Sequence, residues 1–276
     1  NGQGPQPFFW RAPTDNDYGA KLPTRLKAWR EASYQTPKAE SFNVSKDGDK
    51  SIVKVTYRFP QVDAQWEITY KVFANGIIKV DNRFVAEGTE TPMIPRVGLR
   101  MQLSEILNDL TYYGRGPEEN YRDRRTSQFI GEYTTPIKDL YEPYIRPQEN
   151  EHRTDIYWCA LTTKQKAGLL FIADRTFELN ASNYLLGSLD SGETIDNGAP
   201  RTNETNHRHL TDPQPVKQVD MFIDYRMMGV GGDNSWGAIA HEPYLIRPGV
   251  ENTIEYGFSI VPFDKKADYK NLIYQY

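Results

Sequence analysis

The chain of 276 residues contains 38% hydrophobic and 25% charged residues, enough to bury a sizeable core, and all-β folds of roughly 200–250 residues often form one unit. Its mean hydropathy is −0.70, and no apolar run approaches the roughly 20 residues of a membrane span, which excludes such a span. Lys and Arg are scattered among Asp and Glu at a net charge of −4, so there is no basic face for nucleic acid, and a neutral ligand fits better.

The chain begins with Asn1 and a stretch of Gly, Gln and Pro, without an apolar core, which is typical of a linker cut from a longer chain. We therefore expect 1–8 to be a linker from a preceding domain, 264–276 to be a C-terminal tail, and 1–276 to form a single domain. The one cysteine, Cys159, excludes an internal disulfide. It leaves the compartment open, with the bacterial cytoplasm and periplasm as the favoured candidates.

A dense polar stretch follows at residues 11–17, Arg-Ala-Pro-Thr-Asp-Asn-Asp. It is not an EF-hand, because that loop needs an oxygen ligand at its fifth position and a glutamate at its twelfth, where this chain has Gly19 and Leu26. The stretch is typical of a polar loop whose carboxylates accept backbone N–H bonds and pair with Arg11. A role beside a ligand is the alternative for three of its residues, Asp15, Asn16 and Asp17.

Thr24 to Ala32 is the segment with a helical pattern, because Leu26 and Trp29 lie three residues apart on one side. Beyond it, apolar and polar residues alternate in 51–59 and 66–73, which predicts two half-buried strands. Asn75-Gly76 separates the second of these from 77–84 and predicts a hairpin whose two turn residues both have positive φ.

Five further strands are expected, each bounded by Gly, Pro or Asp-rich segments: Arg96 to Leu103, Thr154 to Leu161, Gly168 to Ala173, Gln218 to Tyr225 and Thr253 to Val261. No alternation of strands with helices and no fixed repeat is present. The predicted fold is therefore all-β, a large antiparallel two-sheet β-sandwich. Residues 186–216 have little core-forming pattern and should include long exposed loops.

His207 and His209 would lie on one face of a strand, close enough to share a metal, but a closed zinc site usually needs four ligands and few softer donors remain. The same histidines are also candidates for acid–base chemistry on a sugar ring, with no carboxylate partner fixed by the sequence. Glycoside hydrolysis needs two carboxyl groups flanking the bond. Glu118 and Glu119 would point to opposite faces of a strand, so we find no catalytic dyad.

The most informative segment is Gly229 to Gly237, in which three glycines within four positions precede Trp236. Clustered glycines indicate a backbone path that side chains would obstruct, and the following Asp-Asn-Ser run favours turns. Two interpretations of Trp236 are open at this point. The ring either closes the end of a β-structure or forms a platform for a ligand.

Taken in order, five motifs strongly resemble the C-terminal domain of family 2 β-galactosidases: 11–19, 113–124, 141–150, 207–210 and 229–236. The resemblance spans nearly the whole chain. It implies a galactose-mutarotase-like sandwich (supersandwich) that follows other domains, among them a TIM barrel supplying both catalytic glutamates and the Mg and Na sites. The implied partners are that barrel, the β-galactoside substrate and, in the parent enzyme, further copies in a homo-oligomer.

For individual residues, the resemblance implies that Trp236 extends into the mouth of the barrel and stacks on the sugar, chiefly in the aglycone region. Asp233 and Asn234 beside it are the other expected substrate-binding residues of that loop. Gly19 and the residues just after it match a loop that borders the active site and shifts as the substrate moves inward, where glycine suits a hinge. For the 118–124 and 149–153 segments, we expect an ion network that holds the fold.

The leading hypothesis is therefore the C-terminal domain of a retaining β-galactosidase, inactive by itself. Two alternatives stay open: an autonomous mutarotase-like sugar epimerase with a histidine and a carboxylate, and a non-catalytic carbohydrate-binding module. Both alternatives predict a complete ligand pocket within the chain. The leading hypothesis predicts an exposed, incomplete rim with the indole of Trp236 facing solvent.

Overall fold

The computed structural model describes residues 3–86, 92–190, 209–234, 236–250 and 253–275. These residues contain twelve strands: β1 (Gln3–Phe8), β2 (Ala39–Asp47), β3 (Lys50–Phe59), β4 (Ala64–Val72), β5 (Ile78–Ala86), β6 (Arg96–Ser104), β7 (Asp109–Gly116), β8 (Phe129–Pro136), β9 (Arg153–Thr162), β10 (Gly168–Ser182), β11 (Gln218–Met227) and β12 (Thr253–Phe263). The short α-helices are α1 (Asp15–Gly19), α2 (Leu22–Arg25), α3 (Lys27–Tyr34), α4 (Leu186–Leu189) and α5 (Tyr269–Ile273). None of the helices in this part of the chain has the length and apolar character to cross a membrane.

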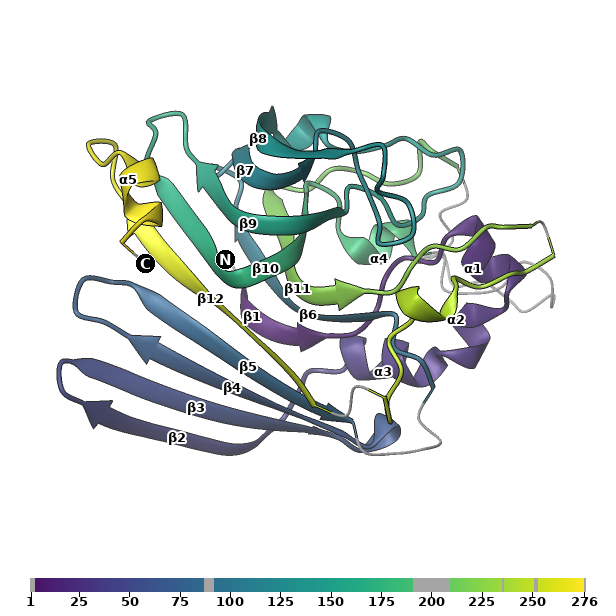
Figure 1. Cartoon of the computed structure of the whole chain (residues 1–276), viewed down its shortest axis with the longest axis horizontal. Helices are drawn as coiled ribbons and strands as arrows, with labels where there is room; N and C mark the ends of the chain where they lie inside the picture. Colours follow the sequence, from purple (N-terminus) through teal and green to yellow (C-terminus); the bar gives the residue numbers. More distant parts are fainter. Residues whose placement is uncertain (1–2, 87–91, 191–208, 235, 251–252, 276) are drawn as a thin grey trace.

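All strand pairs are antiparallel and join in one curved sheet of order β1-β6-β11-β10-β12-β5-β4-β3-β2, from which β9, β7 and β8 branch off β10. Figure 1 shows β2 to β5 as one blade, connected through the long strand β12 to the layer that contains β6, β10 and β11. The expected all-β antiparallel class is confirmed. The expected layers are linked by hydrogen bonds into a continuous sheet.

The alternating pattern acts as predicted in the β3–β4–β5 blade. Trp66 and Ile68 of β4 are buried while Glu67 between them is more exposed, because successive side chains of a strand point to opposite faces. Phe9 lies against Trp66 with ring centroids 5.5 Å apart, and against Phe84 at 5.4 Å. The residue just after β1 thus packs on the blade and closes the main core.

The hairpin between β4 and β5 forms, but with a different loop from the one predicted. The Phe73 amide donates to the Ile77 carbonyl and the Gly76 amide donates to the Phe73 carbonyl, at 2.9 and 3.0 Å. Gly76 has φ +86°, whereas the φ of Asn75 is not positive. A three-residue loop with a single left-handed glycine therefore replaces the two-residue turn, and this loop type needs positive φ only at its last position.

The predicted helix at 24–32 is broken at Leu26 (φ −110°, ψ 16°) into α2 and α3. Helix α1 was missed, although Thr14 and Asp17 form a capping box at its start. Residues 1–8 include β1, which pairs with β6, and the expected tail at 264–276 includes α5. Of the expected loop region 186–216, residues 186–189 form α4 and 191–208 lie outside the described residues.

Candidate functional site

Trp236 is 93% exposed. The interpretation that this ring closes the end of a β-structure is therefore wrong for this chain, and the predicted exposure of the indole is confirmed. The ring extends from the segment 229–237, which follows β11 and which we call the tryptophan loop. Figure 1 shows the segment after β11 running beside helix α1, at one end of the sheet.

The glycines of the tryptophan loop meet the requirements that their clustering predicted. Gly231, Gly232 and Gly237 have φ values of +67°, +101° and +88°, which residues other than glycine rarely adopt. A Cβ at Gly232 would lie 2.5 Å from Asn16 Nδ2, and one at Gly237 would lie 2.6 Å from the Gly19 carbonyl oxygen. The loop therefore packs its backbone directly on helix α1.

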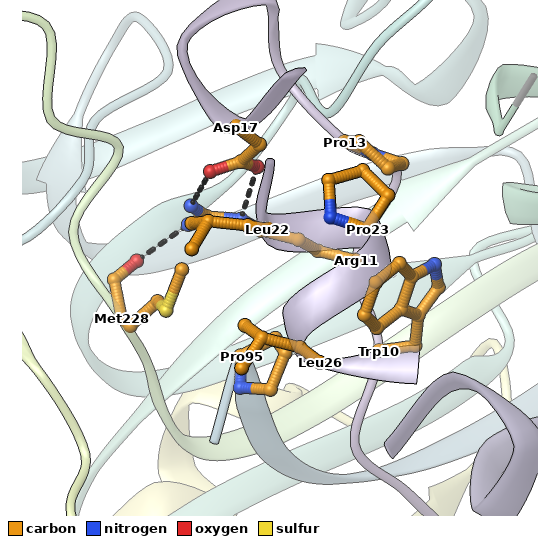
Figure 2. A pocket seen from close by; sticks show the side chains of 9 residues that line it. All are labelled: Trp10, Arg11, Pro13, Asp17, Leu22, Pro23, Leu26, Pro95 and Met228. Carbon is orange, nitrogen blue, oxygen red and sulfur yellow. Dashed lines mark hydrogen bonds and ion pairs between the residues drawn. The ribbon is translucent and has the colours of Figure 1, made fainter. Parts of the chain in front are cut away.

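Arg11 fixes the beginning of the tryptophan loop, as Figure 2 shows. Its guanidinium donates to the carbonyl oxygens of Met228 at 2.7 Å and Gly229 at 3.1 Å. Two further N–H groups donate to the two carboxylate oxygens of Asp17, at 2.7 and 3.0 Å. Burial acts to lower the pKa of Arg11, but the Asp17 carboxylate outweighs it and leaves that pKa above its usual value.

A second anchor comes from Asp123, in the segment that follows β7. Its two carboxylate oxygens accept from the amides of Val230 at 3.0 Å and Gly231 at 2.8 Å. The side chain of Asn16 donates to the Val230 carbonyl at 3.3 Å. Three of the motifs singled out in the sequence, 11–19, 113–124 and 229–236, therefore meet at one place and fix the backbone of the loop.

The tip of the tryptophan loop is held by local contacts. The Trp236 amide donates to Asn234 Oδ1 at 2.8 Å, a turn of the kind predicted for the Asp-Asn-Ser run. The Asp233 carboxylate contacts the imidazole of His241, and both side chains are largely exposed. Asn234 thus orients the backbone of Trp236, while Asp233 links the loop to His241 in the segment that follows it.

The polar residues of helix α1 separate into two roles. Asp17 is buried by Arg11, and it also accepts the Thr14 amide at 3.0 Å, so the predicted structural role is confirmed for it. Asp15 is exposed on the rim, where it pairs with Arg146 at 3.6 Å. Asn16 is partly buried against the loop, and Gly19 is exposed at the end of the helix.

The two predicted histidines are not brought together among the described residues. His207 lies outside them, and His209 is an exposed residue of a bend, where its amide donates to Asp212. The expected strand therefore does not include His209. In the described part of the chain, no group of three or more His, Cys, Asp or Glu side chains is arranged to hold a metal ion.

The cavity nearest to these anchors is small. It has a volume of about 10 Å³, lies behind Arg11 and is lined mainly by apolar side chains, among them Trp10, Leu26 and Met228 (Figure 2). This is about the volume that one water-sized sphere occupies. It does not accommodate a sugar.

Sequence reasoning missed a buried polar network in the strands behind the tryptophan loop. His152 contacts Asn180 Oδ1 with Nδ1 at 2.7 Å and Glu178 with Nε2 at 3.0 Å, while Arg96 contacts Glu149 at 3.3 Å and Asp224 at 3.2 Å. Glu178 also accepts the Met227 amide, which precedes the loop, at 2.7 Å. Glu149 and Arg122, which lie in the two segments where an ion network was expected, take part in it, Arg122 through Glu178 at 3.3 Å. The sequence did not predict its members in β6, β10 and β11.

The pKa values of Asp224 and His152 in this network are both raised. Burial raises the pKa of Asp224 to about 7, against the opposing effects of the Arg96 and His152 charges. Burial acts to lower the pKa of His152, but the hydrogen bond to Glu178 and the charge of that carboxylate raise it above its usual value. His152 is fully buried, so this histidine and carboxylate are enclosed by protein and do not face a ligand pocket.

The architecture and the exposed loop define an antiparallel β domain that presents the exposed side chain of Trp236 at one end of the sheet. The family of the β-galactosidase small chain matches residues 3–260. The chain therefore belongs to the β-galactosidase small-chain family.

Relatives found by sequence agree with this assignment. The chain is 33% identical to a β-galactosidase of Priestia megaterium over 243 residues, and 33% identical to one of Lactobacillus delbrueckii subsp. bulgaricus over 245 residues. Each alignment covers 88% of this chain and 22% of the relative, so the chain spans less than a quarter of their length. A solved galactose 1-epimerase from Lactobacillus acidophilus is similar with a TM-score of 0.45 and 7% identity, over 81% of this chain and 66% of that one.

Proposed function

We propose that this chain is the part of a β-galactosidase that completes the substrate site from outside, while the catalytic groups lie in the remaining polypeptide. The parent enzyme then hydrolyses terminal β-D-galactosides with retention of configuration. Membership in the small-chain family and the small share of each relative that the chain covers support this division of roles.

The observation that carries the proposal is the exposure of Trp236 on an otherwise fixed loop. An indole that is 93% exposed loses no packing when a ligand or another domain covers it, and its flat face matches the C–H face of a pyranose ring. The contact is worth on the order of 1 kcal/mol, the scale of aromatic pairs, which changes affinity several-fold. Trp236 therefore positions the sugar, chiefly on the aglycone side, and transfers no proton.

The residues around the loop act through Trp236. Arg11 and Asp123 fix the loop backbone from two sides, and Asn234 holds the Trp236 amide. Gly19 lies against Gly237, so a shift of the segment after α1 would displace the tryptophan loop. Asp15, on the same exposed side of α1, is a further rim residue available to a ligand.

Retaining hydrolysis requires two carboxyl groups about 5–5.5 Å apart beside the scissile bond. We assign these groups, together with the Mg and Na ions, to the part of the parent enzyme outside this chain. The described residues contain no cluster that fits a metal. The chain supplies a platform and its support, and the chemistry takes place on its partner domain.

The direct test compares the full-length polypeptide with the 276-residue chain on a chromogenic β-galactoside. We expect turnover by the full-length polypeptide only, with the β-anomer of galactose as the first product seen by NMR. Turnover by the 276-residue chain alone would contradict the division of roles. Release of the α-anomer would contradict retention.

A further inference from the structure

A large polar groove lies on the sheet apart from the tryptophan loop. Its volume is about 920 Å³, and it is lined by β4, β5 and the beginning of β12, by the end of β11 and by the irregular part of β10 around Arg175. The pairing of β10 with β9 shifts register between Ile172 and Phe177, and the groove occupies this region. Neither the tryptophan loop nor helix α1 contributes a residue to it.

Several charges along the groove have an oppositely charged partner within the protein. Lys71 contacts Asp81 at 2.9 Å, Arg83 contacts Glu255 at 3.5 Å, and Lys79 pairs with Asp174. A single anion or cation would have to compete with these internal partners. A neutral ligand whose hydroxyl groups both donate and accept can bind beside these side chains without separating the pairs.

Asn82, which lines the groove, has a donor that is not satisfied within the protein. The side chain is buried, and Oδ1 accepts from Trp66 Nε1 at 3.0 Å. An indole N–H can only donate, so this contact fixes the amide orientation. Nδ2 then keeps no hydrogen-bond partner. Arg122 also lines the groove, and its buried Nε has no hydrogen-bond partner, although its Nη1 lies 3.3 Å from Glu178.

Two aromatic rings complete the lining. Tyr225 and Tyr256 have ring centroids 6.2 Å apart, and both are only partly buried. The Tyr256 hydroxyl donates to the Ile223 carbonyl at 3.2 Å, which leaves its ring as the part that faces a ligand. Pyranose rings combine C–H faces with hydroxyl rims, so they match a lining of aromatic faces, unpaired N–H donors and ion pairs.

We propose that this groove is a second carbohydrate site, for one or two neutral pyranose rings, separate from the rim around Trp236. Buried donors at Asn82 and Arg122 bind hydroxyl oxygens, and Tyr225 and Tyr256 contact the ring carbons. The groove has the size of typical small-molecule sites, which range from about 300 to 1,000 Å³. The proposal does not depend on the catalytic role of the parent enzyme.

The test is equilibrium dialysis of radiolabelled D-galactose with the full-length polypeptide. Thr176 lines the groove and is exposed, so Thr176→Trp fills the groove without altering the core. Ser45→Trp, on the exposed edge strand β2, adds the same ring elsewhere. We expect each chain of the Thr176→Trp protein to bind one galactose molecule fewer than a wild-type chain. The Ser45→Trp protein should bind the same number of galactose molecules as the wild type.

A second variant examines the donor itself. Asn82→Asp retains an oxygen for Trp66 and replaces the unpaired N–H₂ by an acceptor, so binding at the groove should weaken at least about tenfold.

Equal galactose binding by wild type and Thr176→Trp would overturn the proposal, as would displacement of the sugar by sodium sulfate. Turnover of a chromogenic galactoside is measured in parallel, and Thr176→Trp should leave it unchanged. If the full-length wild type shows no turnover, the proposed function fails. The dialysis still tests whether the groove binds galactose.

Discussion

Gly19 and Gly237 are in direct backbone contact, so close that a Cβ on Gly237 would lie 2.6 Å from the Gly19 carbonyl oxygen. The contact joins the end of helix α1 to the loop that carries Trp236. Neither residue has a side chain that could transmit or absorb a displacement. A change in the backbone of one segment therefore has to be accommodated by the other.

Gly237→Ala should displace the tryptophan loop from helix α1. The new methyl group meets the Gly19 carbonyl at a position with φ +88°, so strain and overlap add. Gly249→Ala is the matched control, because Gly249 has φ +89° with open space around it, and its cost is strain alone, about 1 kcal/mol. Kinetics of the full-length enzyme should give a higher KM for galactosides with large aglycones in Gly237→Ala only. Equal KM values for the two variants would show that the contact does not position the loop.

Asp123→Ala should loosen the tryptophan loop from the other side. The substitution leaves the amides of Val230 and Gly231 without their charged acceptor, at a cost of about 2 kcal/mol. Denaturant unfolding should report this loss, and KM should rise as for Gly237→Ala. Glu105→Ala, at an exposed position after β6, should change neither quantity. A destabilised Asp123→Ala protein with unchanged KM would mean that the anchor serves the fold alone.

Asp17→Asn should be among the more damaging single substitutions near the site. It removes the charge that compensates Arg11, which is only 2% exposed, and breaking a buried ion pair in this way costs about 3 kcal/mol or more. The free energy of unfolding measures the effect. Asp139→Asn, which affects an exposed pair with Lys138, should cost less than about 1 kcal/mol. Similar losses for the two variants would refute the structural role of Asp17.

The stability of the chain should contain a component that falls as pH rises. The folded state holds a proton on Asp224, because burial raises its pKa from 3.8 to about 7. The contribution is complete below about 3.8, the unfolded value, and is lost as pH rises through about 7, with a slope of at most about 1.4 kcal/mol per pH unit. The raised pKa of His152 acts in the same direction.

Asp224→Asn isolates this component, because the amide imitates the protonated acid at every pH. The difference in unfolding free energy between variant and wild type should move in favour of the variant from pH 4 to pH 7. Denaturant titrations at several pH values measure it. Two parallel curves would mean that Asp224 is not the group that titrates.

Local alternation was sufficient to predict most of the blade. Trp66 and Ile68 alternate with Glu67 and Thr69, and this period of two directly encodes a half-buried strand. Strand β2 escaped prediction because all of its residues are exposed, so Phe42 and Val44 do not mark a buried face. The loop after β4 was assigned the wrong turn because Asn75-Gly76 suits both hairpin loops.

The support of the site could not be predicted to the same degree. The glycines around Trp236 predicted an unusual backbone, and the family resemblance predicted an exposed ring. The partners of that backbone are distant in sequence: Asp123 reaches Val230, and Arg11 reaches Met228, only because the sheet brings their segments together. His152 and Glu178 likewise meet through the packing of β9 against β10. A single sequence contains no local signal for such pairs.

The most direct test of the central claim is the affinity of the full-length enzyme for the aglycone part of its substrate, measured for the wild type, Trp236→Phe and Trp236→Ala. Because Trp236 is exposed and makes no core contact, neither substitution should lower the stability of the chain. We predict that Trp236→Ala weakens aglycone binding and acceptor use several-fold more than it slows the first chemical step, and that Trp236→Phe lies between it and the wild type. Unchanged aglycone affinity in Trp236→Ala would contradict the account.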